Sequence, residues 1–403
     1  MEKGILIMGL ILSPLFTAFP LSIAHAVHEE RGNISTLIAQ ENGKTKEGAA
    51  SSVITADAHP KKEFTLIAQD SDLEIRPGKV IRAWTFNGTM PAPPLRFTEG
   101  DNVTIHFINK TPVGHTIHFH GEHDDKNDGV SPVIQSGQSY TYNFIPNHAG
   151  ALLYHCHALP TSFHIRMGMY GIQIVDPKDP TLLKPAREFA LVYSESDPPS
   201  QQNFQALYYP VNGYFDQYMD GNALKVNQYE LVRFYIINIG TTTPISFHPH
   251  STIFKVYQSG MLSNEPFDAQ TLEIGTGNAA IVEARYNWPG TYLFHPHGLQ
   301  EERGAMGEID VMSSTPENSN LTKSVSMIDW QYDLQKKLQK PVIIDYDKSA
   351  EAHVGGEILS TDNSSLLVYG ISTIQYWILP TVLLSGSGAA AIIAALIFRS
   401  KRS

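Results

Sequence analysis

The chain has 403 residues, of which 42% are hydrophobic and 17% charged, and this globular composition excludes a wholly disordered or fibrous protein. Its formal net charge of −11 at pH 7 lacks the basic footprint that nonspecific nucleic-acid binding needs. The single cysteine, Cys156, cannot form an internal disulfide.

The N-terminal segment predicts an export signal. Lys3 precedes an apolar run, and Ala24-His25-Ala26 fits the pattern of small residues at a cleavage site. We therefore expect a signal peptide at residues 1–26. Residues 27–61, rich in Gly, Ala, Ser, Thr and charged side chains, are expected to form a flexible linker.

Short β-strands separated by Gly, Pro and Asn turns dominate the next part of the chain. We expect strands at residues 64–69, 80–86, 102–108, 139–145, 151–156, 170–175, 189–194, 231–239, 279–286 and 291–296. Their spacing predicts an all-β fold of two tandem β-sandwich or barrel domains, at residues 62–180 and 181–345.

The C-terminal segment predicts a membrane anchor. A second linker at 346–375 precedes residues 376–398, which carry no charge and are long enough to cross a bilayer as a transmembrane helix. Arg399, Lys401 and Arg402 form a positive flank within the tail 399–403, which we expect to be cytoplasmic. The body of the protein should then lie outside the cytoplasm, anchored to the cell membrane.

Two histidine-rich motifs occur twice, which indicates an internal duplication. Residues 148–160 match 287–300, and residues 115–121 match 244–251. The match aligns histidines in both copies, but Ile245 and Pro296 occupy the positions of His115 and Cys156. The first copy therefore carries potential metal ligands that the second lacks.

The parity of extended strands divides these side chains between two sites. Because successive residues of a strand point to opposite faces, Cys156 should point away from His155 and His157. Two histidines, a cysteine and a weak axial methionine form the blue-copper set, which predicts a mononuclear centre of His115, Cys156, His164 and Met169. The remaining imidazoles suit a cluster of coppers better than one metal: His118, His120, His155, His157, His248, His250, His295 and His297.

These motifs, together with the segment Phe86–Val103, resemble the multicopper oxidases over residues 62–345, and within them the two-domain members built from Greek-key cupredoxin domains. The resemblance implies that the mononuclear set binds type 1 copper. It implies type 2 ligands at His118 and His248, and type 3 ligands at His120, His155, His157, His250, His295 and His297.

The resemblance also implies an activity and an assembly. Electrons from an unidentified reductant would pass from the type 1 copper to a trinuclear cluster that reduces dioxygen to water, with about four coppers per subunit. Family members of this size close the cluster between domain 1 of one subunit and domain 2 of the next, so we expect a homotrimer.

The copper nitrite reductases are the rival interpretation. They too are two-domain cupredoxin trimers, and residues 290–309 resemble them. They carry an aspartate at the position of His118 and no histidine at that of His157. A reductase would use His120, His155 and His297 as type 2 ligands and His250 in catalysis. A copper-storage or electron-carrier protein would explain the blue site alone.

Reduction of dioxygen needs protons, and Asp124, Asp125 and Glu301 flank the ligand motifs as candidate proton relays. Exposed loop carboxylates without a catalytic role are the alternative for these residues. The reductant stays open among phenols, cuprous or ferrous ions, a small redox protein and a nitrogen compound.

Overall fold

The structure is a computed structural model that describes residues 60–196 and 207–344. The predicted signal peptide, most of the first linker, and everything from 346 to 403, including the expected transmembrane helix, lie outside the described residues. Within the described ranges, no helix has the length and apolarity that a membrane crossing requires.

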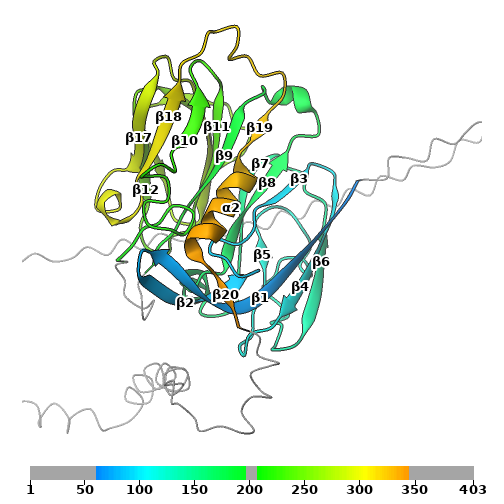
Figure 1. Cartoon of the computed structure of the whole chain (residues 1–403). Coiled ribbons are helices and arrows are strands. Elements are labelled where there is room, and N and C mark those ends of the chain that lie inside the picture. Colours follow the sequence, from blue (N-terminus) through cyan, green and yellow to red (C-terminus); the bar gives the residue numbers. More distant parts are fainter. Residues whose placement is uncertain (1–59, 197–206, 345–403) are drawn as a thin grey trace, which may run out of the picture. The chain divides into compact units, whose positions relative to one another are not determined.

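The first domain consists of two facing sheets (Figure 1). One has the order β2-β1-β4-β6 and the other the order β3-β8-β7-β5. Their bounds are β1 Lys61–Arg76, β2 Lys79–Phe86, β3 Leu95–Thr98, β4 Asn102–Asn109, β5 His118–Phe119, β6 Ser139–Phe144, β7 Gly150–His155 and β8 Tyr170–Asp176. Aromatic side chains such as Phe97, Phe107 and Tyr142 fill the space between the sheets.

The second domain repeats this arrangement with sheets of the order β14-β13-β16-β11-β9-β19 and β10-β18-β17-β12-β15. The first sheet contains β9 Arg187–Tyr193, β11 Val232–Asn238, β13 Phe254–Gln258, β14 Phe267–Ala269, β16 Asn278–Ala284 and β19 Val325–Ser326. The second contains β10 Leu224–Asn227, β12 Ile245–Pro249, β15 Leu272–Ile274, β17 Gly290–Pro296 and β18 Gly307–Met312. Short 3₁₀ turns lie at Pro180–Leu182 and Glu301–Arg303.

The predicted strands and the predicted duplication are both present. Each of the ten expected segments overlaps an observed strand. In the first domain His118 pairs with His155 across β5 and β7, and in the second His248 pairs with His295 across β12 and β17. The two histidine motifs therefore meet in the same register in both domains.

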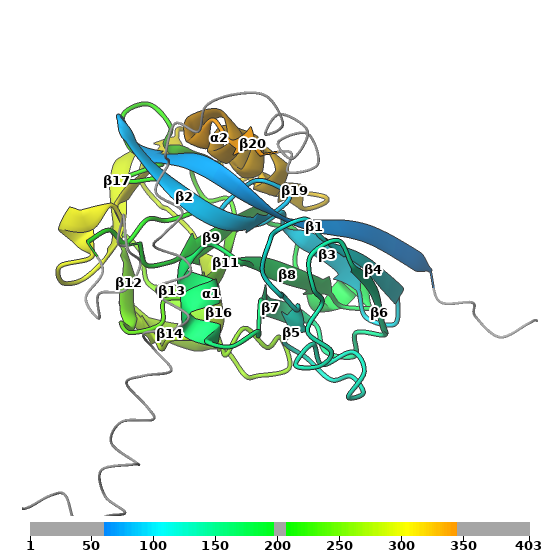
Figure 2. The same cartoon turned by 90° about the horizontal axis from the view of Figure 1, so that it is seen from below.

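Two helices interrupt the expected all-β architecture. Helix α1, Thr161–Arg166, lies in the loop between Cys156 and Met169, and helix α2, Ile328–Gln339, follows the second domain. Figures 1 and 2 show α2 beside the blue strands of the first domain. It contacts β1 of the first domain and β9 of the second. After α2 the chain returns to the first domain, where β20, Val342–Ile343, pairs with β1.

Helix α2 is held by glutamines rather than by an apolar stripe. Gln331, Gln335 and Gln339 recur every four residues and are all buried. Gln331 accepts from the amide of Ala190 at 2.8 Å and donates to its carbonyl at 2.9 Å, while Gln335 donates to the carbonyl of Pro91 at 2.7 Å. The helix thus bonds to the backbone of both domains.

A buried ionic network joins the two domains next to an apolar contact layer that contains residues of both. Glu188 of β9 accepts from the guanidinium of Arg96 in β3 at 2.8 Å and from that of Arg233 in β11 at 2.9 Å. Burial alone would raise the pKa of Glu188, but the two arginines outweigh it and hold that pKa below its usual value. Glu188 is therefore an ionised link between the domains.

Candidate metal centres

Three donor atoms from distant parts of the chain converge inside the first domain. The Nδ1 atoms of His115 and His164 lie 3.1 Å apart, and the Sγ atom of Cys156 lies 3.7 Å from the first and 3.3 Å from the second. His115 lies in the segment before β5, Cys156 follows β7, and His164 lies on α1. All three residues are buried and can hold one metal ion.

The size and chemistry of this triangle fit a metal. A point inside it lies about 2 Å from all three atoms, which is a metal–nitrogen distance in proteins. Burial lowers the pKa of His115 to about 3, with a smaller contribution from His164, and burial lowers that of His164 to about 4. Both imidazoles are thus neutral and offer lone pairs. Burial raises the pKa of the Cys156 thiol to about 11, and a bound cation would compensate the buried thiolate.

Met169, the residue directly before β8, completes the predicted set. It is fully buried in the cluster of side chains that contains Cys156. Its carbonyl accepts from the amide of Cys156 at 3.0 Å, and its own amide donates to the carbonyl of His164 at 3.3 Å. Two histidines, a cysteine and a methionine form the type 1 copper set, so this prediction is confirmed.

Four further histidines of the first domain, His118, His120, His155 and His157, form a second group on the opposite side of β7. The ring of His118 lies 5.1 Å from that of His120, 5.4 Å from that of His155 and 5.5 Å from that of His157. The Nε2 atoms of His120 and His155 are 3.3 Å apart. His118, His120 and His155 can hold one metal together, as in a type 2 copper site.

The second domain gathers its four histidines in the same way. The ring of His248 lies 5.1 Å from that of His250, 5.7 Å from that of His295 and 5.0 Å from that of His297. The Nε2 atoms of His250 and His295 are 3.0 Å apart. We call each of these two groups of four a histidine quartet.

Backbone carbonyls fix the tautomers of three of these histidines. The Nδ1 atom of His118 donates to the carbonyl of Asp128 at 2.6 Å, and that of His248 to the carbonyl of Gln270 at 2.7 Å. His155 donates likewise to the carbonyl of Cys156 at 3.0 Å. Because a carbonyl only accepts, these Nδ1 atoms carry the protons, and the Nε2 lone pairs are free for a metal.

The sequence analysis did not identify Asp128. Its carboxylate lies 3.3 Å from Nδ1 of His118, and the same nitrogen donates to its backbone carbonyl. Gly129 has φ +78°, and a Cβ atom there would meet the carbonyl oxygen of Ile117 at 1.8 Å, so only glycine permits this close approach. The Asp-Gly turn ten residues after His118 was the available signal.

The three carboxylates predicted as proton relays have different surroundings. Glu301 lies 3.3 Å from Nδ1 of His295, which brings it to the second quartet. Asp124 is exposed and instead accepts hydrogen bonds from the backbone and side chain of Asn127. Asp125 is exposed in the same turn. The structure therefore brings one of the three to a ligand histidine.

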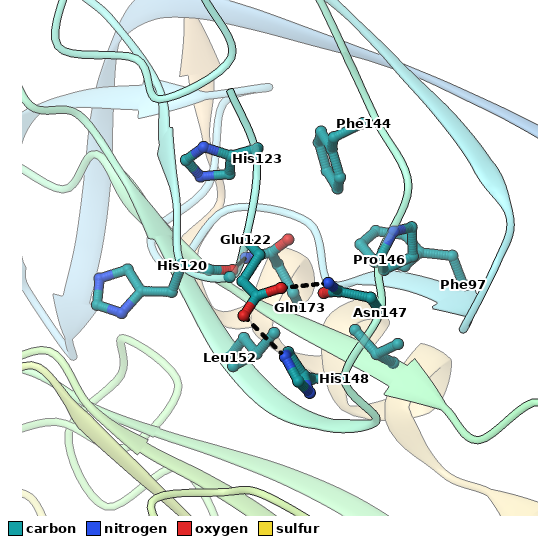
Figure 3. A pocket seen from close by; sticks show the side chains of 12 residues that line it. Phe97, His120, Glu122, His123, Phe144, Pro146, Asn147, His148, Leu152 and Gln173 are labelled. Atoms are coloured by element: carbon teal, nitrogen blue, oxygen red, sulfur yellow. Dashed lines mark hydrogen bonds and ion pairs between the residues drawn. The ribbon is translucent and has the colours of Figure 1, made fainter. Parts of the chain in front are cut away.

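A small pocket lies behind the backbone of His120 and extends toward Phe97 and Phe144 (Figure 3). Its volume is about 20 Å³, enough for a single water molecule. The carboxylate of Glu122 contacts Nε2 of His148 at 3.2 Å, whereas the ring of His120 points away from this pair. The pocket therefore does not open onto the metal-binding face of the quartet.

Comparisons with known proteins agree with this site. Family models described as multicopper oxidase match residues 68–180 and 184–314. The copper-containing nitrite reductase of Neisseria gonorrhoeae is 30% identical over 278 residues, which cover 64% of this chain and 70% of that protein. Laccase-15 of Oryza sativa is 32% identical over 153 residues, which cover 34% of this chain and 24% of the laccase.

Two solved structures give the same result at the level of the fold. A copper nitrite reductase from Nitrosomonas europaea matches with a TM-score of 0.59 and 31% identity, covering 62% of this chain and 94% of that one. A crystal structure of a multicopper oxidase matches with a TM-score of 0.58 and 37% identity, covering 62% and 89%.

The fold and the site define a copper-dependent oxidoreductase with two cupredoxin domains and type 1 copper in the first. The chain belongs to the multicopper oxidase family and is related to the copper nitrite reductases. Similarity to the curated nitrite reductase spans both domains, whereas similarity to the laccase is partial. At this finer level, the comparisons favour the reductase over the oxidase.

Proposed function

We propose that the protein is a multicopper oxidase that takes single electrons from a reductant at type 1 copper and reduces dioxygen to water at a trinuclear copper cluster. The observation that supports this proposal most strongly is the presence of two histidine quartets in matching register, with the equivalent residues His118 and His248 in the same tautomer. Eight imidazoles exceed what one type 2 copper uses.

Residues of the chain connect the two proposed centres. Cys156 faces the type 1 site, while its neighbours His155 and His157 face the first quartet. The hydrogen bond from Nδ1 of His155 to the carbonyl of Cys156 at 3.0 Å closes this link. The covalent path and the hydrogen bond would carry the electron between the two sites over a few bonds.

We also propose a homotrimer in which domain 1 of one subunit and domain 2 of the next share each cluster. Within residues 60–196 and 207–344, the recorded ring contacts join the histidines inside each quartet but do not join the two quartets. His248, His250 and His297 are not buried within the single chain. A second copy of the chain would supply the missing half of each cluster.

A copper nitrite reductase is the second candidate, and the two-domain similarity to such enzymes supports it. That activity would need type 1 copper and one type 2 copper, held by His120, His155 and His297 with His250 in catalysis. His118, His157, His248 and His295 would then have no assigned role, although they are arranged like their neighbours. This surplus is the reason to prefer the oxidase.

Substitution of His157 separates the two candidates. His157→Asn should abolish dioxygen uptake by the oxidase, because it removes one proposed cluster ligand, while leaving the blue absorption intact. His106→Asn on β4 is the matched control, since His106 is an exposed histidine outside both sites. Nitrite-dependent production of nitric oxide that persists in His157→Asn would support the reductase instead.

We further propose that the protein is exported and anchored to the cell membrane by its C-terminal segment, because residues 376–398 are uncharged over a bilayer-spanning length. Fractionation of cells expressing the full chain and a chain truncated after residue 345 tests this proposal. The full chain should sediment with membranes and the truncated chain should not. Equal sedimentation of the two would contradict the anchor.

A further inference from the structure

Helix α2 bonds to a short buried segment of the first domain, residues 89–91 in the connection between β2 and β3. Three side chains of the helix make these bonds: Tyr332, Gln335 and Gln339. The hydroxyls of Tyr332 and Thr89 share a hydrogen bond at 3.1 Å, and Gln335 donates to the carbonyl of Pro91 at 2.7 Å. Gln339 accepts from the amide of Met90 at 3.2 Å and donates to its carbonyl. Both backbone groups of Met90 are therefore bonded to one side chain of α2.

The same segment packs against the loop that carries the axial ligand Met169. The side chain of Met90 is buried against Gly168, where a Cβ atom would lie 3.0 Å from Sδ and 3.2 Å from Cγ of Met90. Two residues after Met90, the amide of Ala92 donates to the carbonyl of Tyr170 at 2.8 Å. Gly168 and Tyr170 are the chain neighbours of Met169. The segment held by α2 therefore contacts the chain on both sides of the axial ligand.

Strand β2 contacts this loop as well. The amide of Trp84 donates to the carbonyl of Met167 at 2.9 Å, and the indole of Trp84 lies 4.9 Å from the ring of His164. Gly168 has φ +117°, and a Cβ atom there would come within 2.9 Å of the carbonyl oxygen of Trp84. The loop is thus confined between β2 and the side chain of Met90. Because such close packing transmits displacement, a shift of Met90 moves the loop with it.

We propose that Gln339 is a positioning residue for the type 1 site, which keeps the axial ligand Met169 in place by acting through Met90. The axial ligand tunes the reduction potential of such a copper, so the hydrogen bonds of Gln339 contribute to that potential. Helix α2 follows the second domain in the chain. A late segment of the chain therefore adjusts the redox properties of a centre in the first domain, to which it contributes no ligand.

The first test is amide hydrogen exchange of the metal-free protein. Gln339→Met keeps the length of the side chain and a good helix former but removes its hydrogen bonds to Met90. It should speed exchange over residues 163–170 by about tenfold. Gln331→Met is the matched control, because Gln331 is equally buried on the same helix but bonds only within the second domain, to Ala190 and Tyr218. Exchange over residues 163–170 should stay at the wild-type rate in this control, and unchanged exchange in Gln339→Met would contradict the proposal.

The second test is redox titration of the copper-loaded protein without oxygen, followed by its blue absorption. Gln339→Met should raise the reduction potential, in the same direction as loss of the Met169 thioether. We expect at least a threefold change in the equilibrium constant for reduction, which is about 28 mV at 59 mV per tenfold. Gln331→Met should keep the wild-type potential. An unchanged potential in Gln339→Met, or an equal shift in Gln331→Met, would overturn the proposal.

A variant of Met90 tests the path itself. Met90→Ala leaves its backbone bonds to Gln339 but removes the contact with Gly168, so it should raise the potential alone, and it serves if Gln339→Met fails to fold. Gln339→Met should then add little in the Met90→Ala background, whereas additive shifts would refute a path through Met90. The inference rests on the type 1 site and holds for dioxygen or nitrite as acceptor, so failure of the oxidase proposal would leave these results unaffected.

Discussion

Glu188 offers a direct test of how the two domains are held in place. Glu188 is 1% exposed, and its carboxylate accepts from Arg96 of the first domain and Arg233 of the second. Arg233 is itself fully buried and keeps Glu283 as a second partner at 2.6 Å, and Arg96 keeps Asp176 at 2.7 Å. Removal of Glu188 therefore leaves two arginines paired once instead of twice.

The expected cost follows from these contacts. Glu188→Ala leaves a buried guanidinium nitrogen of Arg233 without its acceptor, which costs about 3–5 kcal/mol of unfolding free energy and lowers Tm by roughly 6–20 °C. Glu188→Gln keeps an acceptor oxygen but removes the negative charge that strengthens two hydrogen bonds, so we expect its unfolding free energy to fall by about 2 kcal/mol. Thermal and urea unfolding of the metal-free protein, followed by circular dichroism, measure both variants.

The matched control is the exposed pair of Lys255 and Asp268, whose side chains are 54% and 66% exposed. Asp268→Ala should lower the unfolding free energy by less than about 1 kcal/mol because solvent screens the pair. A double-mutant cycle between Arg96 and Glu188 then isolates the link between the domains. If the unfolding free energy of Glu188→Ala lies within about 1 kcal/mol of the wild-type value, the buried network does not hold the domains together and the reasoning is refuted.

Two further predictions concern the type 1 site. The folded pKa values of about 3 for His115 and 4 for His164 lie below the usual value, so the unfolded chain binds protons first as pH falls. As the pH falls below ~6.5, the free energy of unfolding of the metal-free protein should therefore decrease by about 1.4 kcal/mol per pH unit for each such histidine. Urea unfolding at several pH values measures this slope, and His164→Gln should reduce it. A slope unchanged in His164→Gln would contradict the buried neutral imidazole. Met169→Leu should keep the blue absorption but raise the reduction potential, because loss of the thioether donor destabilises the oxidised copper; an unchanged potential in redox titration would exclude Met169 as axial ligand.

Much of the metal site could be predicted because most of its ligands lie in short motifs whose spacing determines which face of a strand each side chain occupies. An H-x-H pair on a strand places both imidazoles on one face, and the residue between them on the other. This parity separates Cys156 from His155 and His157, as the structure shows. The equivalent motif in the second domain lacks the thiol because Pro296 replaces it, so the restriction of type 1 copper to the first domain was also readable from the sequence.

The features that could not be predicted depend on contacts between distant residues. Helix α2 buries Gln331, Gln335 and Gln339, so the apolar period that reveals most helices is absent from its sequence. Trp84 reaches the copper ligands because β2 packs against the loop before Met169, a pairing that no spacing in the sequence encodes. Asp128 meets His118 through a turn whose path depends on Gly129.

In the proposed assembly, the arrangement of the two quartets depends on a contact between chains. The quartets are equivalent in register, and each contains rings whose Nδ1 donates to a backbone carbonyl, which leaves Nε2 for a metal. This equivalence is the physical basis for preferring a shared cluster. It also makes the number of bound coppers the quantity that separates the two candidate functions.

The most direct test of the central claim is copper content per subunit of the purified full-length protein, measured together with its optical and spin-resonance spectra. The oxidase predicts about four coppers per subunit, including a spin-coupled pair with a near-ultraviolet band, and dioxygen uptake on addition of reductant. About two coppers per subunit, with only type 1 and type 2 signals and with nitrite-dependent formation of nitric oxide, would contradict the trinuclear cluster.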